Sequence, residues 1–144
     1  IRAEFSMDIE RSYWFRNSMA VERGPLVYAL DMKEKWKTVK EVAGVRDYEV
    51  YPESAWNYAL EENPAFEVSI NPVGETPFSK AHPPVKLKTK GRRLDAWELE
   101  ANSAGTLPTS PVRPDGEEEE ITLIPYGCTK LRVSQFPWYI NEDR

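Results

Sequence analysis

Two side chains that commonly act as bases or nucleophiles each occur only once in this chain. His82 precedes Pro83 and Pro84 in a loop sequence, and Cys128 follows Gly127 in a turn sequence. Nucleophilic catalysis needs a nucleophile beside a base, and a zinc site needs several nitrogen, sulfur or carboxylate ligands. No pair of histidines or cysteines exists at metal-ligand spacing. We therefore expect His82 at the surface, Cys128 as a small, partly buried side chain, and neither a metal nor a catalytic residue in this chain.

The 24 acidic residues offer a different chemistry, because two carboxyl groups roughly 5–9 Å apart can hydrolyse a glycosidic bond. With so many acids some pairs arise by chance, and none of them occurs in a recognisable motif. We assign no catalytic carboxylate. A hydrolase that acts alone would need a concave site with two facing acids of displaced pKa.

The tryptophans have the clearest binding chemistry, since an indole can stack on the apolar face of a sugar ring. They are Trp14, Trp36, Trp56, Trp97 and Trp138. Trp56 is followed by Asn57 and Tyr58, which places two aromatic rings and an amide close together. Trp56, Asn57 and Tyr58 are therefore candidate carbohydrate-binding residues. Core packing is the alternative, because Trp56, Tyr58 and Leu60 also alternate as the buried face of a strand does.

Length and composition limit the class of protein. A chain of 144 residues fits one domain, residues 1–144, and a content of 40% hydrophobic residues supports a packed core. The formal net charge of −5 gives no basic footprint for nucleic acid. No apolar run approaches the roughly 18 residues of a membrane-spanning helix. We expect neither nucleic acid nor a membrane as a partner.

Short stretches of alternating, β-branched or aromatic residues recur along the chain and predict strands. Twelve prolines mark the connections between them. The candidate strands are residues 1–10, 11–15, 19–23, 26–30, 35–39, 47–51, 56–60, 66–70 and 86–90, followed by a strand, a turn and a strand within residues 121–137. Roughly seven to ten short strands with long, proline-rich loops predict an all-β fold, an antiparallel β-sandwich of jelly-roll-like form.

Residues 1–10 show the strictest alternation, with apolar side chains at every odd position. This pattern predicts a strand with one face in water. A natural chain seldom begins inside its first strand, so we expect this chain to be the C-terminal piece of a longer protein. A processed, mature N-terminus is the alternative.

Four other stretches carry specific expectations. Residues 86–90 alternate lysine with Leu87 and Thr89, which suits an edge strand protected by charge. The four acids at 117–120 suit a solvated loop whose charges guard the strand that begins at Ile121. Residues 33–42 fit a helix or a strand equally well, and residues 94–100 are ambiguous in the same way.

Three further stretches are VERGPLVYAL at residues 21–30, YEVYPESAWNYAL at 48–60 and ITLIPYGCTKLRVSQFP at 121–137. Together they resemble the C-terminal region of bacterial glycoside hydrolases of the β-L-arabinofuranosidase type, glycoside hydrolase family 127. Their order and spacing match as well, so the resemblance covers most of the chain.

The resemblance implies a division of labour between domains. In that family an N-terminal (α/α)-barrel holds the active site, where a glutamate and cysteines around a zinc ion cleave the sugar linkage. For this chain it implies a non-catalytic accessory β-sandwich domain that braces the catalytic (α/α)-barrel of the same protein, plant-type glycans as ligands of the parent protein, and a periplasmic or secreted location. Cys128 lies outside the family's catalytic cysteine pattern, so no cofactor is expected in this chain.

A carbohydrate-binding module that holds glycan by itself is the second hypothesis. It requires tryptophans or tyrosines exposed in a line or a cleft. The bracing role instead requires an exposed apolar surface on which the barrel docks.

Overall fold

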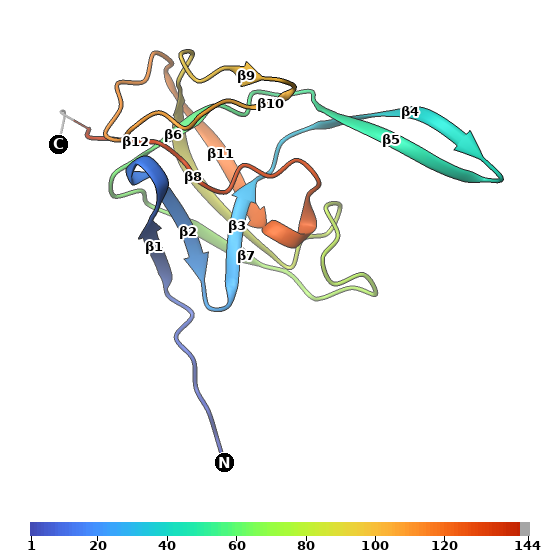
Figure 1. The fold of residues 1–144 in the computed structure, drawn as a ribbon. Coiled ribbons are helices and arrows are strands. Elements are labelled where there is room, and N and C mark those ends of the chain that lie inside the picture. Colours follow the sequence, from blue (N-terminus) through green and yellow to red (C-terminus); the bar gives the residue numbers. More distant parts are fainter. Residues whose placement is uncertain (142–144) are drawn as a thin grey trace.

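The computed structural model describes residues 1–141 as a β-protein with an eight-stranded sheet as its body (Figure 1). The strands of this sheet are β1 (Ile9–Tyr13), β2 (Met19–Arg23), β3 (Leu26–Leu30), β6 (Tyr58–Glu61), β7 (Glu67–Ile70), β8 (Val85–Arg93), β11 (Glu118–Pro125) and β12 (Trp138–Tyr139). Their spatial order is β1–β2–β3–β11–β8–β6–β12, and β7 pairs with β8 beside this path. Every pairing is antiparallel except that of β12 with β6.

Two small sheets and two single-turn helices complete the described part of the chain. The small sheets pair β4 (Glu34–Val42) with β5 (Val45–Pro52) and β9 (Leu99–Glu100) with β10 (Ser103–Ala104). The 3₁₀ turns are η1 (Phe15–Asn17) and η2 (Tyr126–Cys128). No helix among these residues is long and apolar enough to cross a membrane.

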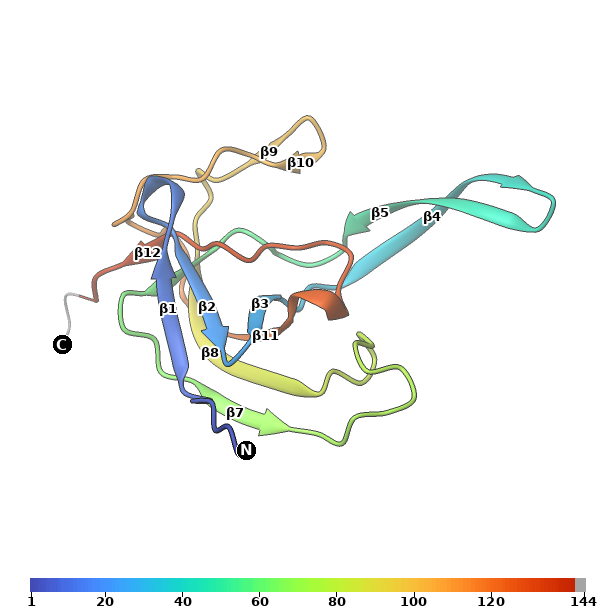
Figure 2. The ribbon, with the colours of Figure 1, turned by 60° about the horizontal axis from the view of Figure 1, so that its bottom comes forward.

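The large sheet curls so that β1, β2 and β3 lie over β8, and the core fills the space between the two halves (Figure 2). Met19 and Val21 of β2 share one buried cluster with Leu60 of β6, Leu87 of β8 and Leu123 of β11, and each is fully buried. Burial of one such side chain stabilises a fold by roughly 1.5–3 kcal/mol. The predicted all-β, antiparallel sandwich is confirmed.

Strand β8 lies in the middle of the sheet, so the prediction of an edge strand at residues 86–90 was wrong. It pairs with β11 along one side and with β7 and β6 along the other. The prediction of a loop at 117–120 was also wrong, because residues 118–120 belong to β11. The two errors have one cause: Lys88 pairs with Glu120 at 3.2 Å and Lys90 pairs with Glu118. Opposite charges on neighbouring strands are compatible with a central position.

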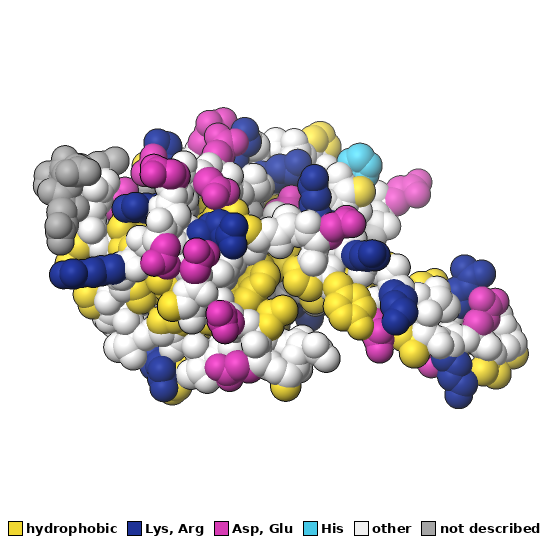
Figure 3. Space-filling view, turned by 90° about the horizontal axis from the view of Figure 1, so that it is seen from above, with side chains coloured by type: hydrophobic (Ala, Val, Ile, Leu, Met, Phe, Trp, Pro, Cys, Tyr) yellow, Lys and Arg dark blue, Asp and Glu magenta, His cyan; other side chains and the backbone are white. Residues whose placement is uncertain are grey.

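Strands β4 and β5 form a hairpin that projects from the body (Figures 1 and 3). The ladder runs from Glu34 opposite Pro52 to Val42 opposite Val45, with one irregularity between Thr38 and Lys40. The two-residue turn places Ala43 at φ 51° and Gly44 at φ 81°, the left-handed values that tight hairpin turns require. Residues 33–42, which fitted a helix or a strand from sequence, are therefore mainly strand. We call residues 34–52 the arm.

Three predicted elements differ in the structure. Residues 1–8 form no strand although they alternate: they pair with no described strand, and Ile1 and Phe5 are exposed. Residues 131–134 form no second strand after η2: a single hydrogen bond of 2.8 Å joins Leu30 N to the oxygen of Val133. Residues 94–100 form turns, and only β9 within them is extended.

Candidate functional site

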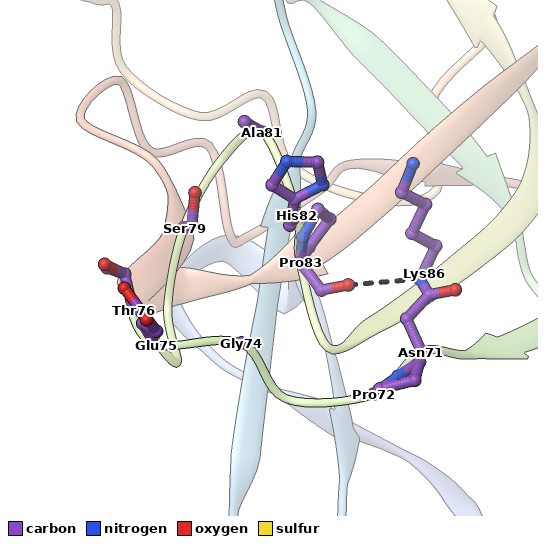
Figure 4. A pocket seen from close by; sticks show the side chains of 10 residues that line it. All are labelled: Asn71, Pro72, Gly74, Glu75, Thr76, Ser79, Ala81, His82, Pro83 and Lys86. Atoms are coloured by element: carbon purple, nitrogen blue, oxygen red, sulfur yellow. Dashed lines mark hydrogen bonds between the residues drawn. The ribbon is translucent and has the colours of Figure 1, made fainter.

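One hollow of about 670 Å³ lies inside the loop between β7 and β8 (Figure 4). Asn71 closes the loop because its side-chain Nδ2 donates to the oxygen of Pro83 at 3.1 Å, and its backbone N–H donates to the oxygen of Pro84 at 2.8 Å. The lining residues are Asn71, Pro72, Gly74, Glu75, Thr76, Ser79, Ala81, His82, Pro83 and Lys86. Prolines at 72 and 83 fix φ at two positions of this wall.

The loop hollow lacks the geometry of a nucleophile and a base. His82 is exposed, as expected from sequence, and Figure 4 places Thr76 and Glu75 away from it along the loop. Among the ten lining residues Figure 4 draws one hydrogen bond, from Asn71 to Pro83, and none reaches the imidazole. No aromatic ring lines the hollow, so it also lacks a platform for a sugar.

A second hollow of about 390 Å³ lies between the root of the arm, the β9–β10 hairpin and residues 131–133. Trp56 lines it and is half-buried. Its ring meets that of Trp97 edge-on, with centroids 5.0 Å apart and planes at 70°. Trp97 is fixed in turn, because its Nε1 donates to the oxygen of Gly105 at 2.9 Å. The indole of Trp56 therefore packs against a fixed neighbour beside the hollow, which we call the groove.

Asn57 and Tyr58, the other two candidate carbohydrate-binding residues, are buried and bonded within the fold. The side chain of Asn57 donates to the backbone oxygens of Leu94 at 2.9 Å and Trp97 at 3.3 Å. The hydroxyl of Tyr58 donates to Glu119 at 2.9 Å. The pKa of Tyr58 is raised to about 12, mainly by burial and also by this bond and the negative charge of Glu119. The structure therefore brings only Trp56 to a hollow, and carbohydrate binding there stays a prediction.

Other residues of the groove were not identified from the sequence. Tyr51 and Glu49 come from β5, Asn102 comes from the β9–β10 turn, and Ser103 is the first residue of β10. The stretch YEVYPESAW already holds Glu49, Tyr51 and Trp56 within eight positions, so a local signal existed for these three. Asn102 has a left-handed φ of 61°, and its approach to Trp56 depends on the fold of residues distant in sequence.

The remaining tryptophans divide between surface and core. Trp97 and Trp138 are buried at 3% and 8% exposure, as core packing requires. Trp14 and Trp36 are exposed, at 60% and 48%. Trp36 lies on the arm, where its ring meets that of Tyr48 edge-on with centroids 5.4 Å apart. Neither of these two exposed tryptophans lines the groove with Trp56.

Cys128 is the last residue of η2 and is buried, with 5% of its surface exposed. Burial, and then the negative charge of Asp31, raises the pKa of its thiol, which favours the unreactive protonated form. Within residues 1–141 no three histidine, cysteine, aspartate or glutamate side chains gather where they could hold a metal ion. The zinc that the family resemblance implies belongs to the catalytic barrel, and no chemical step is derived through it here.

Glu34 is a buried carboxylate at the root of the arm, with its side chain 4% exposed. Its Oε1 accepts hydrogen bonds from the Thr129 hydroxyl at 2.7 Å and from the backbone N–H groups of Lys130 and Leu131 at 3.1 and 3.3 Å. Burial raises its pKa, but these bonds and the ammonium of Lys80 outweigh burial and lower it. Glu34 is thus buried and ionised, so it anchors the arm. It carries no proton to give, so it cannot act as a general acid.

Comparison with protein-family models matches residues 14–135 to the model described as the glycoside hydrolase family 127 C-terminal domain. The match begins at Trp14, directly after β1, and ends in the connection before β12, so it includes the arm, the groove and the loop hollow. Neither the curated proteins nor the solved structures returned a match.

Proposed function

The chain belongs to the family of glycoside hydrolase family 127 C-terminal domains, and on that premise we propose that it docks on and braces the catalytic (α/α)-barrel of a glycoside hydrolase without taking part in the chemistry. Family membership makes it an accessory domain of such an enzyme. The observation that carries the bracing role is the arm. Its aromatic side chains Trp36 and Tyr48 pack on each other and leave nearly half of their surface exposed.

The arm has two unlike faces. Strand alternation and the register place Trp36, Tyr48 and Val50 on one face, with Trp36 opposite Val50 and Thr38 opposite Tyr48. The other face carries Lys37 opposite Glu49 before the irregularity, and Lys40 opposite Asp47 after it. Trp36 and Tyr48 are 48% and 46% exposed. An arm with an aromatic face and a charged face is suited to lie along another protein surface, aromatic side inward.

A two-stranded hairpin by itself is only marginally stable in water. The body supports the arm at its root, where Lys33 N donates to Ser54 Oγ at 2.9 Å and Glu53 N donates to the oxygen of Lys33 at 2.8 Å. Beyond the root, the described chain gives the strands no second layer, and all residues of β4 after Glu34 are exposed. A partner that covers the aromatic face would supply that layer.

A second apolar surface supports docking on a large partner. Val27 of β3, Phe78 of the β7–β8 loop and Tyr126 of η2 line one open hollow and are 40%, 48% and 43% exposed. Figure 3 shows hydrophobic side chains along the arm and between the arm and the body. Contiguous exposed apolar surface of several hundred Å² commonly marks a protein interface.

The test uses the enzyme that carries this domain, with Trp36→Ser and Tyr48→Ser introduced together. Loss of two large aromatic anchors from an interface commonly costs more than about 2 kcal/mol. We expect the double variant to lower the unfolding midpoint of the whole enzyme, measured by calorimetry, and to leave the far-UV circular dichroism of the isolated chain unchanged.

The matched control carries Lys37→Ser and Lys40→Ser on the opposite face of the same hairpin. Surface changes of this kind usually alter stability by less than about 0.5 kcal/mol. Equal midpoints for the wild type and the aromatic double variant would overturn the bracing role of the arm. Hydrolysis of aryl glycosides by the isolated chain would overturn the non-catalytic assignment.

A further inference from the structure

We propose that the groove binds a neutral sugar residue, with Trp56 as the stacking platform and with Glu49, Asn102 and Ser103 as hydrogen-bonding partners. The site extends the function of the chain beyond docking. It rests on family membership, which places the chain in an enzyme that works on glycans, and not on the bracing role of the arm.

The aromatic part of the site is pre-organised. Trp56 is held edge-on by Trp97, and the Trp97 indole is itself tied to the oxygen of Gly105 at 2.9 Å. Tyr51 lines the same groove, and its hydroxyl donates to Oε2 of Glu49 at 2.6 Å, which fixes the phenol ring. Two fixed rings lose little conformational entropy when they receive a ligand.

The polar part of the site suits a polyhydroxyl ligand. The contacts of Tyr51 and Lys37 with Glu49 both fall on Oε2, which leaves Oε1 to accept hydrogen bonds from sugar hydroxyls. Asn102 supplies an amide, which both donates and accepts, and Ser103 supplies a hydroxyl. Arg132 also lines the groove, where its Nε donates to the oxygens of Tyr126 and Thr129 and the rest of the guanidinium supplies further N–H donors.

The β9–β10 turn forms the far wall of the groove. Ala101 and Asn102 are its two central residues, at φ 49° and 61°. These are the left-handed values that a two-residue hairpin turn requires, as in the turn of the arm. Here the turn presents Asn102 and Ser103 to the groove, opposite the rings of Tyr51 and Trp56.

Size and charge favour a neutral sugar over a larger or an acidic ligand. The groove volume of about 390 Å³ lies within the range of roughly 300–1,000 Å³ that small-molecule sites occupy. One acid, Glu49, and one base, Arg132, line the groove, so its formal charge is zero and it offers an acidic sugar no net attraction. A neutral sugar offers hydroxyls to these groups and an apolar ring face to Trp56. A peptide segment of the parent enzyme is the competing occupant, and the experiment distinguishes it.

The test is native affinity electrophoresis of the 144-residue chain in gels that contain arabinoxylan, galactomannan or polygalacturonate. We expect at least one of the two neutral polysaccharides to retard the wild type, and polygalacturonate to have no effect. Trp56→Ala removes the platform and should weaken the retardation constant about tenfold, in line with the contribution of one aromatic contact. Trp36→Ala is the matched control, an exposed tryptophan on the arm, and should behave as the wild type does.

Because Trp56 also packs on Trp97, Glu49→Gln and Asn102→Ala provide variants outside the core, and both should weaken retardation while circular dichroism stays unchanged. Retardation by neither neutral polysaccharide, or equal retardation of the wild type and the Glu49, Asn102 and Trp56 variants, would overturn the proposal. Retardation by polygalacturonate alone would overturn it too.

The competing occupant is a peptide segment of the parent enzyme. If Trp56→Ala abolishes docking in the parent enzyme and the wild-type chain binds no sugar, the groove is assigned to that segment. The arm variants at Trp36 and Tyr48 test docking separately, since neither residue lines the groove.

Discussion

The hydroxyl of Thr129 donates a hydrogen bond of 2.7 Å to Oε1 of Glu34, and this bond joins the root of the arm to the segment that follows η2. The same carboxylate lies 3.7 Å from the ammonium of Lys80, which also pairs with Asp31 at 3.0 Å. A single buried carboxylate thus links the arm, the β7–β8 loop and the connection after β11. The direction in which the arm projects depends on this junction.

Replacement of Glu34 by Gln should destabilise the chain by about 1–3 kcal/mol, because charge-assisted bonds from Thr129, Lys130 and Leu131 would lose their anionic acceptor. Urea unfolding followed by circular dichroism measures the change. Glu41→Gln is the control: Glu41 pairs with Arg46 on the exposed part of the arm, and a surface pair contributes about 0–1 kcal/mol. Equal losses for the two variants would contradict the anchoring role of Glu34.

The lowered pKa of Glu34 should make stability depend on pH in acid. Burial opposes ionisation, and the bonds from Thr129, Leu131, Lys130 and the charge of Lys80 favour it more strongly. The carboxylate therefore contributes stability above its unfolded pKa, near 4.5, and this contribution is lost as the pH falls through the lower folded value. Urea midpoints measured at successive pH values should fall less steeply below 4.5 for Glu34→Gln than for the wild type. Parallel curves would contradict the assignment.

Tyr58 should ionise near pH 12, since burial and the bond to Glu119 raise its pKa to about that value. Difference absorbance of the phenolate, recorded during alkaline titration, should lose one high-pH step in Tyr58→Phe. The same variant should unfold about 1 kcal/mol more easily, because it leaves Glu119 without that donor. Loss of a step near pH 10, the ordinary tyrosine value, in place of the high-pH step would contradict this assignment.

Cys128 should resist thiol reagents in the folded chain. It is the only cysteine, it is 5% exposed, and burial together with the charge of Asp31 raises its pKa. Reaction with a disulfide reagent at neutral pH should be slow in buffer and rapid in guanidinium chloride, with one thiol released per chain. Rapid reaction of the folded chain would place Cys128 at the surface.

Local patterns in the sequence predicted those elements whose neighbours are also local. β2 and β3 were predicted within residues 19–30 because Gly24 and Pro25 form a turn between two apolar runs, and Gly24 takes a left-handed φ of 56°. Residues 1–8 alternate as strictly, yet alternation alone supplies no pairing partner, and no described strand pairs with them. The central position of β8 could not be predicted locally, because the acids that pair with its lysines lie on β11, about thirty residues later in the sequence.

The candidate binding residues show the same limit. Trp56 was identified because aromatic rings and polar groups cluster around it in the sequence. Asn57 and Tyr58 were included for that reason, and they point instead to Leu94, Trp97 and Glu119. The far wall of the groove comes from the β9–β10 turn, more than forty positions beyond Trp56, and alternation within one strand does not specify such an approach.

Hydrogen–deuterium exchange across the arm tests the central claim most directly. Backbone amides of residues 34–52 should exchange rapidly in the isolated chain, because the hairpin lacks a second layer beyond its root. In the enzyme that carries this domain, docking of the aromatic face should slow the exchange of these amides about tenfold or more, while the amides of β8 exchange slowly in both. Equal exchange of the arm in the isolated chain and in the whole enzyme would contradict the account that the arm braces the catalytic barrel.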